Sequence, residues 1–504
     1  MKRHLRNRIV GLAAGTVTFG VISACGGGGS DLGIADGGIR GTGSSVGPVS
    51  GFGSVFVNGV KFNTDSIPNQ EVESDDGIEF ETDLRKGMIL RIEGQWRDDG
   101  TGTADQLIYD DTLRGPVDQV VADPSGAGDF ATLTVMGQSV RVNRQTFVRG
   151  TTYATLLSAA AITEHVRVSA WRQADGSYRA GYIETIAVDA TDVELEGQVS
   201  AVDVEQNRFT IGTITVEYDE DSVSFGSGLT EPALGTATIL EVEGSLAGNV
   251  LTASTIDRAD GRRFSRNAGE DIQLTATIDA SYTASGTAAR PGEFRIGEQT
   301  IRVTDATELD DDLEVSDLNE GLLVQVEGEF LSDNVIEAEK IELRDGNAKV
   351  DGVITSAADN VFLIGGVEVR VLSTTAFTVE GGFDMSFETL PIGTTTVEVE
   401  GVEKQQGTDV FIEALKVQVD DEAAAAEDRI QYKLEGKLAA ISPGAITILG
   451  VTIDAASTSY ADNSQAEITS RFGNGEVVIL KVEYVRDGDS FTAVEIELED
   501  NDDD

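Results

Sequence analysis

The chain has 504 residues, and its 88 Asp and Glu outnumber 37 Lys and Arg, which gives a formal net charge of −51. This charge excludes nucleic acid as the main partner, because such binding rests on neutralising phosphates. With 40% hydrophobic residues and only 8 Pro, the chain is too apolar for a disordered acidic tail, and its length predicts several domains.

The first residues are predicted to form an export signal. Four basic side chains within residues 2–8 precede an apolar stretch at 9–22, which is too short to span a bilayer as an ordinary helix. The sequence Ile-Ser-Ala-Cys follows and ends at Cys25, the only cysteine of the chain. It resembles the lipobox of bacterial lipoproteins. The resemblance implies cleavage between Ala24 and Cys25, removal of a signal peptide at 1–24, and attachment of diacylglycerol to Cys25.

The residues after Cys25 indicate where the lipoprotein is sorted and predict a tether behind the anchor. By the same resemblance, Gly26 implies sorting to the outer membrane of a Gram-negative bacterium, because Asp at this position would prevent that sorting. Residues 25–45 are rich in Gly and Ser and predict a flexible tether. Removal of residues 1–24 takes away four positive charges and no acids, so the net charge becomes −55.

Residues 46–499 repeat a pattern of alternating apolar and polar residues, which is typical of half-buried strands. Each repeat has a strand that usually ends in Glu-Gly, such as Leu240-Glu-Val-Glu-Gly244, and an Ala-x-x-aliphatic motif shortly afterwards. Upstream, an apolar strand runs into Gly and resumes, as at Phe209-Thr-Ile-Gly212, which predicts a tight hairpin. The alanines recur every 73 to 85 residues, at Ala104, Ala180, Ala253, Ala338, Ala414 and Ala493.

These features predict an all-β chain, a tandem array of about six small OB-like Greek-key β-barrel modules. A β-solenoid fits less well because its turns repeat at a shorter pitch, and sandwiches need longer units. The predicted modules span 46–112, 113–191, 192–258, 271–345, 347–420 and 430–499, followed by an acidic tail at 500–504.

Together the motifs resemble a family of bacterial lipoproteins with tandem copies of a domain of unknown function that is expected to be OB-like. The resemblance rests on the lipobox, on Gly-x-Val at the start of each unit, on Phe-x-Ile-Gly, on Val-x-Val-Glu-Gly and on Ala-x-x-Ile. It covers most of residues 46–499. It implies a fold and a location but no activity, because the family has none to carry over.

Residues that support enzymatic chemistry are scarce. Two histidines, His4 and His165, and one cysteine cannot assemble a metal cluster or a disulfide framework, and His165 is interpreted as an ordinary exposed side chain. Acidic runs such as 310–312 lack the spacing of an EF-hand loop and are interpreted as solvated charge. No nucleophile elbow, phosphate loop or dinucleotide fingerprint stands in the required context. We therefore expect no catalytic residue, no metal and no cofactor.

One module differs from the others in charge. Residues 113–191 hold seven Arg and seven acids within a strongly acidic chain. Arg141 and Arg167 each lie between two valines and are predicted to point outward from neighbouring strands. With Trp171 and Arg172 they form a candidate binding site for an anionic or sugar-bearing polymer. The alternatives are that these arginines pair with carboxylates of adjacent modules or are solvated.

We predict a non-enzymatic lipoprotein of the outer membrane, at its periplasmic face or at the cell surface, that acts as a binding or structural element of the envelope. Its expected partners are the membrane, through the lipid anchor, and a polysaccharide or an envelope protein. Two alternatives are a carboxylate-dependent enzyme acting on polysaccharide and a surface adhesin or matrix protein. The enzyme requires a carboxyl pair that faces a concave pocket, whereas an adhesin requires reversible, salt-dependent attachment.

Overall fold

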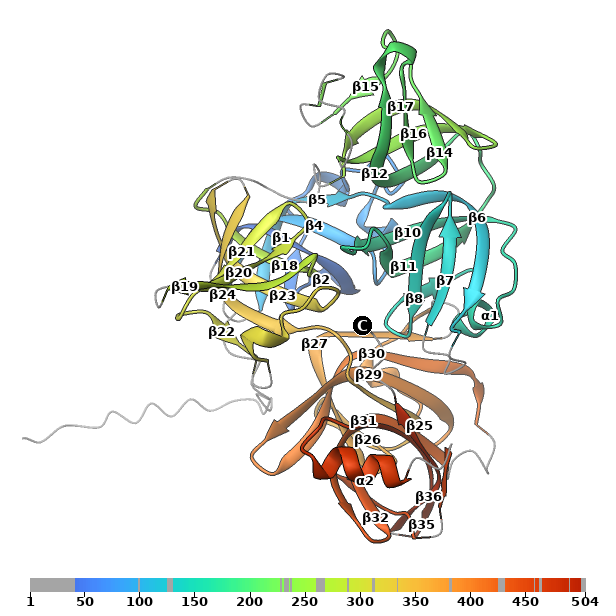
Figure 1. The fold of residues 1–504 in the computed structure, drawn as a ribbon, viewed down its shortest axis with the longest axis vertical. Helices are drawn as coiled ribbons and strands as arrows, with labels where there is room; N and C mark the ends of the chain where they lie inside the picture. Colours follow the sequence, from blue (N-terminus) through green and yellow to red (C-terminus); the bar gives the residue numbers. More distant parts are fainter. Residues whose placement is uncertain are drawn as a thin grey trace, which may run out of the picture. The chain divides into compact units, whose positions relative to one another are not determined.

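A computed structural model describes residues 41–499, apart from 98–99, 125–129, 227–228, 231–234, 236–237, 260–267, 288–289, 311–312, 333, 380–382, 425–430, 457, 462–464 and 489. The predicted signal peptide, the lipidation site at Cys25 and the acidic tail lie outside the described residues. The described chain is all-β and forms six small barrels in tandem (Figure 1). The predicted fold class is confirmed.

All six barrels share one topology, which the second barrel illustrates. Its main strands are β6 (Leu113–Ala122), β7 (Phe130–Val135), β8 (Gln138–Asn143), β10 (His165–Arg172) and β11 (Tyr178–Ile186). β6 pairs with β7, β7 with β8, β8 in parallel with β11, β11 with β10, and β10 again with β6. The sheet therefore closes on itself as a five-stranded Greek-key barrel of the OB type, with α1 (Tyr153–Leu157) between its third and fourth strands.

The main strands of the other barrels follow in chain order. The first barrel has β1 (Gly41–Gly51), β2 (Val55–Val57), β3 (Val60–Asn63), β4 (Ile89–Trp96) and β5 (Thr101–Tyr109). The third has β12 (Val193–Asp203), β13 (Arg208–Ile211), β14 (Ile214–Glu217), β16 (Ile239–Ala247) and β17 (Val250–Arg258). The fourth has a divided first strand, β18 (Asp271–Thr277) and β19 (Ala280–Thr287), then β20 (Arg290–Ile296), β21 (Gln299–Val303), β23 (Leu323–Ser332) and β24 (Val335–Leu343).

The last two barrels continue the same order. The fifth has β25 (Ala348–Ala358), β26 (Val361–Ile364), β27 (Val367–Val379), β29 (Thr395–Gln406) and β30 (Asp409–Ala423). The sixth has β31 (Gln431–Ser442), β32 (Ala445–Ile448), β33 (Val451–Asp454), β35 (Ile479–Asp487) and β36 (Ser490–Glu499), with α2 (Gln465–Gly473). Short strands are β9 (Phe147–Arg149), β15 (Ser224–Phe225), β22 (Glu308–Leu309), β28 (Phe383–Asp384) and β34 (Ser459–Tyr460). Short 3₁₀ turns lie at Pro68–Gln70, Glu81–Asp83, Val204–Gln206, Val315–Asp317 and Phe387–Thr389.

The repeated Glu-Gly motif marks a β-bulge between the fourth and fifth strands. In the third barrel the register shifts between Glu243 and Gly244, and Gly244 lies opposite Ala253, the first residue of the Ala-x-x-Ile motif. A Cβ on Gly244 would lie 2.0 Å from the Thr252 carbonyl oxygen, so no side chain fits there. The two sequence motifs are therefore partners in one register. The same close approach occurs at Gly94, Gly328 and Gly401.

The hairpin between the second and third strands turns on left-handed residues. Gly59 and Gly137 have φ values of +81° and +80°, and the preceding Asn58 and Met136 have φ values of +50° and +47°. Two successive positive φ angles are typical of the type I′ turn, whose twist suits a hairpin. The predicted hairpins are confirmed.

The barrels are joined in pairs by their first strands. The second strand of a barrel pairs only with the later half of the first strand. The earlier halves of two first strands then pair with each other: β1 with β18 in parallel, and β6 with β12 and β25 with β31 antiparallel. The first barrel is thus joined to the fourth, the second to the third and the fifth to the sixth, in three 12-stranded sheets.

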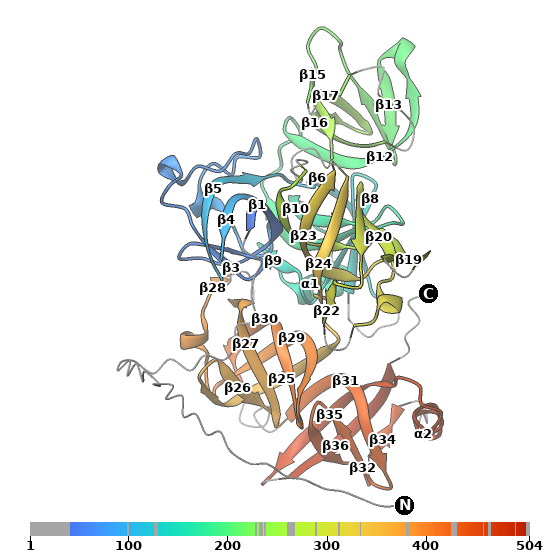
Figure 2. The ribbon, with the colours of Figure 1, turned by 90° about the vertical axis from the view of Figure 1, so that its left-hand side faces the viewer.

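Buried aliphatic side chains fill the barrels. The cores of the second and third barrels merge into one cluster, and so do those of the fifth and sixth. Ile468 of α2, the longer of the two described α-helices, packs into the core that the fifth and sixth barrels share. Figure 2 shows α2 beside the strands of the sixth barrel. None of the helices in the described part of the chain is long and apolar enough to cross a bilayer.

Two predictions about local structure are wrong. Residues 41–45, assigned to the tether, begin β1, and Ser44 and Ser45 are fully buried because this half of the strand pairs with β18. His165, interpreted as exposed, is buried, because it lies on β10 between β6 and β11. In addition, β30 continues to Ala423, beyond the predicted end of the fifth module at 420.

Replacing Gly244 by Val tests the bulge. The new side chain would have to displace the Thr252 carbonyl, and overpacking of this kind costs about 1–3 kcal/mol. We expect urea unfolding, followed by circular dichroism, to begin at a lower urea concentration. The control is Ser245→Val at the next, exposed residue, which should change the free energy of unfolding by less than about 0.5 kcal/mol. Equal stability of the two variants would contradict the close approach.

Candidate functional site

The outward side chains of the first and fourth strands lie where two barrels meet. In the third barrel two cross-strand pairs occupy these positions, Glu194 opposite Glu243 and Glu196 opposite Glu241. Because side chains two residues apart share one face of a strand, all four carboxylates point the same way. Like charges directly opposite each other destabilise a sheet. Positive charge next to this face therefore stabilises the pairing.

The second barrel supplies two arginines at this join. Arg114 of β6 lies opposite Glu194 of β12 on one side and opposite Arg167 of β10 on the other. Arg167 in turn lies opposite Glu184 of β11. Strand register therefore sets a continuous row of charged residues across five strands of two barrels, namely Glu184, Arg167, Arg114, Glu194 and Glu243.

The first barrel adds four aspartates to this row. Asp75 and Asp76 lie between β3 and β4, and Asp110 and Asp111 lie in the connection from β5 to β6. We call the following set the junction cluster: Asp75, Asp76, Asp110, Asp111, Asp192, Glu194, Glu241, Glu243, Arg114 and Arg167. Most of its side chains are buried. The junction cluster thus brings eight carboxylates together with two guanidinium groups.

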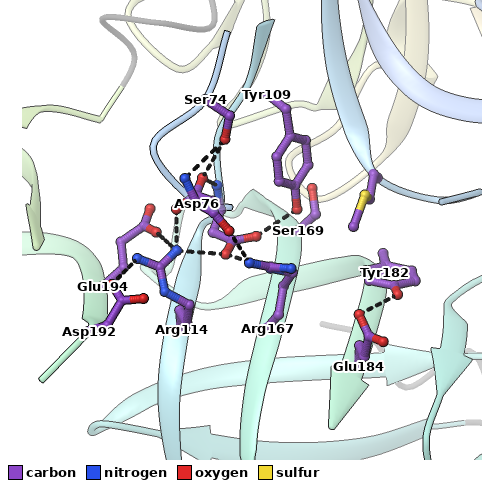
Figure 3. A network of polar contacts seen from close by, with 12 residues as sticks. Ser74, Asp76, Tyr109, Arg114, Arg167, Ser169, Tyr182, Glu184, Asp192 and Glu194 are labelled. Carbon is purple, nitrogen blue, oxygen red and sulfur yellow. Dashed lines mark hydrogen bonds and ion pairs between the residues drawn. The ribbon is translucent and has the colours of Figure 1, made fainter. Parts of the chain in front are cut away.

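Arg114 is the hub of the junction cluster (Figure 3). Its Nη1 donates to Asp76, to Asp111 Oδ2 at 2.9 Å and to Glu194 Oε2 at 3.1 Å. Its Nη2 donates to Asp192 Oδ1 at 2.9 Å. One guanidinium group therefore bonds carboxylates from the first barrel, the connection that follows it and the third barrel.

Arg167 and Tyr109 hold Asp111 from the other side. Arg167 Nε donates to Asp111 Oδ2 at 2.8 Å, and the Tyr109 hydroxyl donates to Asp111 Oδ1 at 2.7 Å. Arg167 also donates to the main-chain carbonyl of Asp76. Asp111, which is completely buried, accepts hydrogen bonds on both oxygens and fixes the second barrel against the first.

The junction cluster carries more negative charge than its arginines neutralise. Burial, together with the Asp76 carboxylate, raises the pKa of Asp111 to about 6. Burial and Asp76 also raise the pKa of Glu194 above its ordinary value. Burial and the Asp75 carboxylate raise the pKa of Glu243 to about 7. These shifts have one physical origin, which is the removal of several carboxylates from water into one small region.

Oxygen atoms of the junction cluster approach one another closely enough to hold a metal ion. Within each of three groups the ligand atoms lie within 4.8 Å of one another. The groups are Asp75, Asp76 and Asp110; Asp76, Asp111 and Glu194; and Asp110, Glu194 and Glu241. We expected no metal because the runs of acids that are adjacent in sequence lack the spacing of metal ligands. The carboxylates of these groups instead come from different barrels. The signal that could have found them is the presence of Glu at all four outward positions of the third module.

The structure does not bring the four predicted ligand-binding residues into one site. Arg167 belongs to the junction cluster, so the alternative that it pairs with carboxylates of another module is confirmed. Trp171 is buried, and its Nε1 donates to the Thr275 carbonyl of the fourth barrel at 2.9 Å. Arg172 donates to the carbonyl of Gln173 at 3.3 Å. Arg141 lies over a phenylalanine ring, with 4.0 Å between its guanidinium carbon and the ring centroid.

Lys416 is one of the few charged side chains that line a mostly apolar cavity of about 100 Å³ between the first, second, fourth and fifth barrels. Lys416 of β30 reaches into the second barrel, where its Nζ donates to the carbonyls of Arg144 and Thr146, each at 2.7 Å. Burial lowers the pKa of the Lys416 ammonium to about 8, against the opposing effect of the Glu398 and Glu400 carboxylates. Lys416 therefore fastens the fifth barrel to the second through main-chain oxygens.

Four segments of the chain match a protein family described as "Domain of unknown function (DUF5666)". They span residues 114–184, 196–257, 283–342 and 435–497, which fall on the second, third, fourth and sixth barrels. The first and fifth barrels, which these segments leave out, have the same strand order. A search of curated proteins found no match to the chain.

The pH dependence of stability tests the buried Lys416. Because its pKa is lowered from 10.5 to about 8, the unfolded chain binds a proton between these pH values that the folded chain does not. The free energy of unfolding therefore rises with pH between 8 and 10.5, and this gain is lost again as the pH falls back to 8. Relative to Lys416→Met, the wild type should gain about 1 kcal/mol per pH unit in this window.

Urea unfolding at a series of pH values measures this difference. Lys433→Met is the control, because that lysine side chain is 66% exposed, and it should keep the wild-type slope. If Lys416→Met also kept that slope, the lysine would not titrate as its burial requires.

Proposed function

We propose that this chain, which belongs to the DUF5666 family of domains of unknown function, is a non-enzymatic, lipid-anchored protein of the outer membrane that serves as a structural and binding element of the cell envelope. The observation that carries the proposal is the joining of barrels through their first strands. It holds the described barrels together in pairs, which a loose string of modules would not do. A large acidic body on a single lipid anchor suits a scaffold at a membrane surface.

Support for the anchor comes from the N-terminal sequence. The only cysteine, Cys25, ends a lipobox-like Ile-Ser-Ala-Cys sequence behind a basic and apolar leader. Each buried CH₂ of an acyl chain contributes about 0.8 kcal/mol, so several chains together hold a protein stably at a membrane. An anchor of this kind keeps the barrels near the membrane surface.

Support for a binding role comes from the outer side of the second and third strands, where OB-folds bind oligosaccharides. In the first barrel Lys61 of β3 lies 5.5 Å from the ring centroid of Phe56 of β2. In the second barrel Arg141 of β8 lies 4.0 Å from the ring centroid of Phe130 of β7. A cation beside an aromatic ring offers a sugar both a hydrogen-bond donor and an apolar face. Repetition of the pair on separate barrels favours a polymer, here a polysaccharide, as the ligand.

Support for a non-enzymatic role comes from the placement of the carboxylates. A glycosidase needs two carboxyl groups that face the substrate on either side of a bond. The closely spaced carboxylates described here lie in the junction cluster, where Asp111 and Glu194 are completely buried. Their partners are side chains of neighbouring barrels, which suits a structural function.

Lipid attachment is tested with the full chain in a Gram-negative host. We expect the wild type to incorporate labelled palmitate and to sediment with the outer membrane. Cys25→Ser should lose the label, because no other residue can form the thioether. Gly26→Asp is the matched control, which should keep the label but accumulate in the inner membrane. An unlabelled wild type would contradict the anchor, and identical fractionation of the wild type and Gly26→Asp would contradict the sorting.

Polysaccharide binding is tested by Arg141→Glu. Loss of the cation beside Phe130 should weaken retention on immobilised envelope polysaccharide roughly tenfold. The matched control is Arg208→Glu, which makes the same charge change at an arginine that is 43% exposed and paired with Asp203, and it should bind like the wild type. Equal binding of all three proteins, or equal loss in both variants, would argue against this face.

A further inference from the structure

The paired barrels balance the outward positions of their first strands in different ways. In the first and fourth barrels most of these positions are neutral, with Ser44 on β1 and Gln273 and Thr275 on β18, and the one acid, Asp271, accepts a hydrogen bond from the main-chain N–H of Thr42 at 2.9 Å. In the fifth and sixth barrels opposite charges meet, as between Lys349 of β25 and Glu435 of β31, whose side chains are 3.1 Å apart. The third barrel differs from these because its first and fourth strands carry Glu at all four outward positions.

The sixth barrel shows a neutralised version of the same face. Lys433 and Lys481 occupy the strand positions that Glu194 and Glu241 occupy in the third barrel, because both pairs of strands have the same register. Lys433 forms an ion pair with the opposite Glu483 at 2.9 Å. The third barrel thus has carboxylates where an equivalent barrel has two ammonium groups.

Glu194 has an unused ligand atom. Its Oε2 accepts a hydrogen bond from Arg114 at 3.1 Å, but its Oε1 has no hydrogen-bond partner within the described part of the chain. The side chain is 0% exposed, so water does not replace the missing donor at the surface. A buried carboxylate oxygen without a partner is costly. Because Glu194 belongs to two of the three carboxylate groups of the junction cluster, this oxygen points to a cation.

We propose that Asp110, Glu194 and Glu241 bind a divalent cation, with Ca²⁺ as the preferred ion. Their ligand oxygens lie within 4.8 Å of one another. Two oxygens that each lie about 2.4 Å from one Ca²⁺ are at most about 4.8 Å apart, so the three residues fit a shared ion. A site made of carboxylate oxygens favours Ca²⁺ over transition metals, which prefer imidazole or thiolate ligands. Ca²⁺ also tolerates the irregular geometry of side chains that come from separate segments.

The ion ties separate parts of the chain together. Asp110 lies in the connection between the first and second barrels, whereas Glu194 and Glu241 lie on β12 and β16 of the third. Arg114 bonds Asp76, Asp111 and Glu194, and the ion bridges Glu194 to Asp110 and Glu241. An ion that binds the folded chain stabilises it by mass action. This inference goes beyond the proposed envelope function and does not depend on where the protein is located.

The test uses the full chain in a mild detergent, stripped with EDTA and dialysed. Millimolar CaCl₂ should raise the unfolding temperature by roughly 5 °C, and titration calorimetry should show saturable binding of Ca²⁺. Glu241→Gln and Glu194→Gln should lose both effects, because each removes one charged ligand while keeping the side-chain shape. Glu483→Gln, at the equivalent outward face of the sixth barrel, is the matched control and should respond like the wild type.

Several outcomes would overturn the site. An equal rise in unfolding temperature in Glu241→Gln, or in the wild type with NaCl at the same ionic strength, would show general screening of an acidic chain. Absence of both heat and shift in the wild type would exclude Ca²⁺ binding. Because Glu194 also bonds Arg114, its variant is compared with Glu241→Gln after circular dichroism shows that both are folded. Retained binding in both folded variants would likewise refute the proposal.

Discussion

The structure depends on a mismatch of length within each barrel, because the second strand is too short to cover the first. In the second barrel β7 covers Val117–Ala122, which leaves one backbone edge open at Leu113 and Arg114. An open edge invites pairing, and the early half of another first strand provides it. Since two first strands pair, the outward side chains beside them lie at a join instead of in water. Their charges therefore have to be balanced within the chain.

That requirement explains why chemically different faces occur on one scaffold. A buried ion pair is favourable only when its geometry and remaining hydrogen bonds offset the loss of hydration. The join between the first and fourth barrels largely avoids buried charge, because most of its outward side chains are neutral. The join between the fifth and sixth barrels meets the condition locally, because Lys349 pairs with Glu435. In the junction cluster Arg114 meets it for four carboxylates at once, although the cluster as a whole holds eight carboxylates and two guanidinium groups. Protons and a divalent cation relieve the same repulsion, so they compete for this cluster.

The barrels could be predicted from the sequence because the features that build them are local. The bulge at Gly244 and its partner Ala253 leave a motif in every repeat, and the hairpin leaves its own glycine. The joins between barrels could not be predicted, because β1 and β18 pair across more than two hundred residues of sequence. For the same reason residues 41–45 resemble a tether in composition, although they form a buried strand. The junction cluster was missed because no short window contains both Asp76 and Glu194.

The neutral charge of the second module now has a structural explanation. Several of its arginines act as counter-ions for acidic neighbours: Arg114 bonds carboxylates of the first and third barrels, and Arg144 pairs with Glu398 of the fifth at 2.6 Å. Arg179 pairs with Asp345, between the fourth and fifth barrels, at 2.7 Å. A strongly acidic chain can bury its joins only if positive charge is concentrated where they converge. The second barrel holds that charge, so substitutions of its buried arginines would loosen several joins at once.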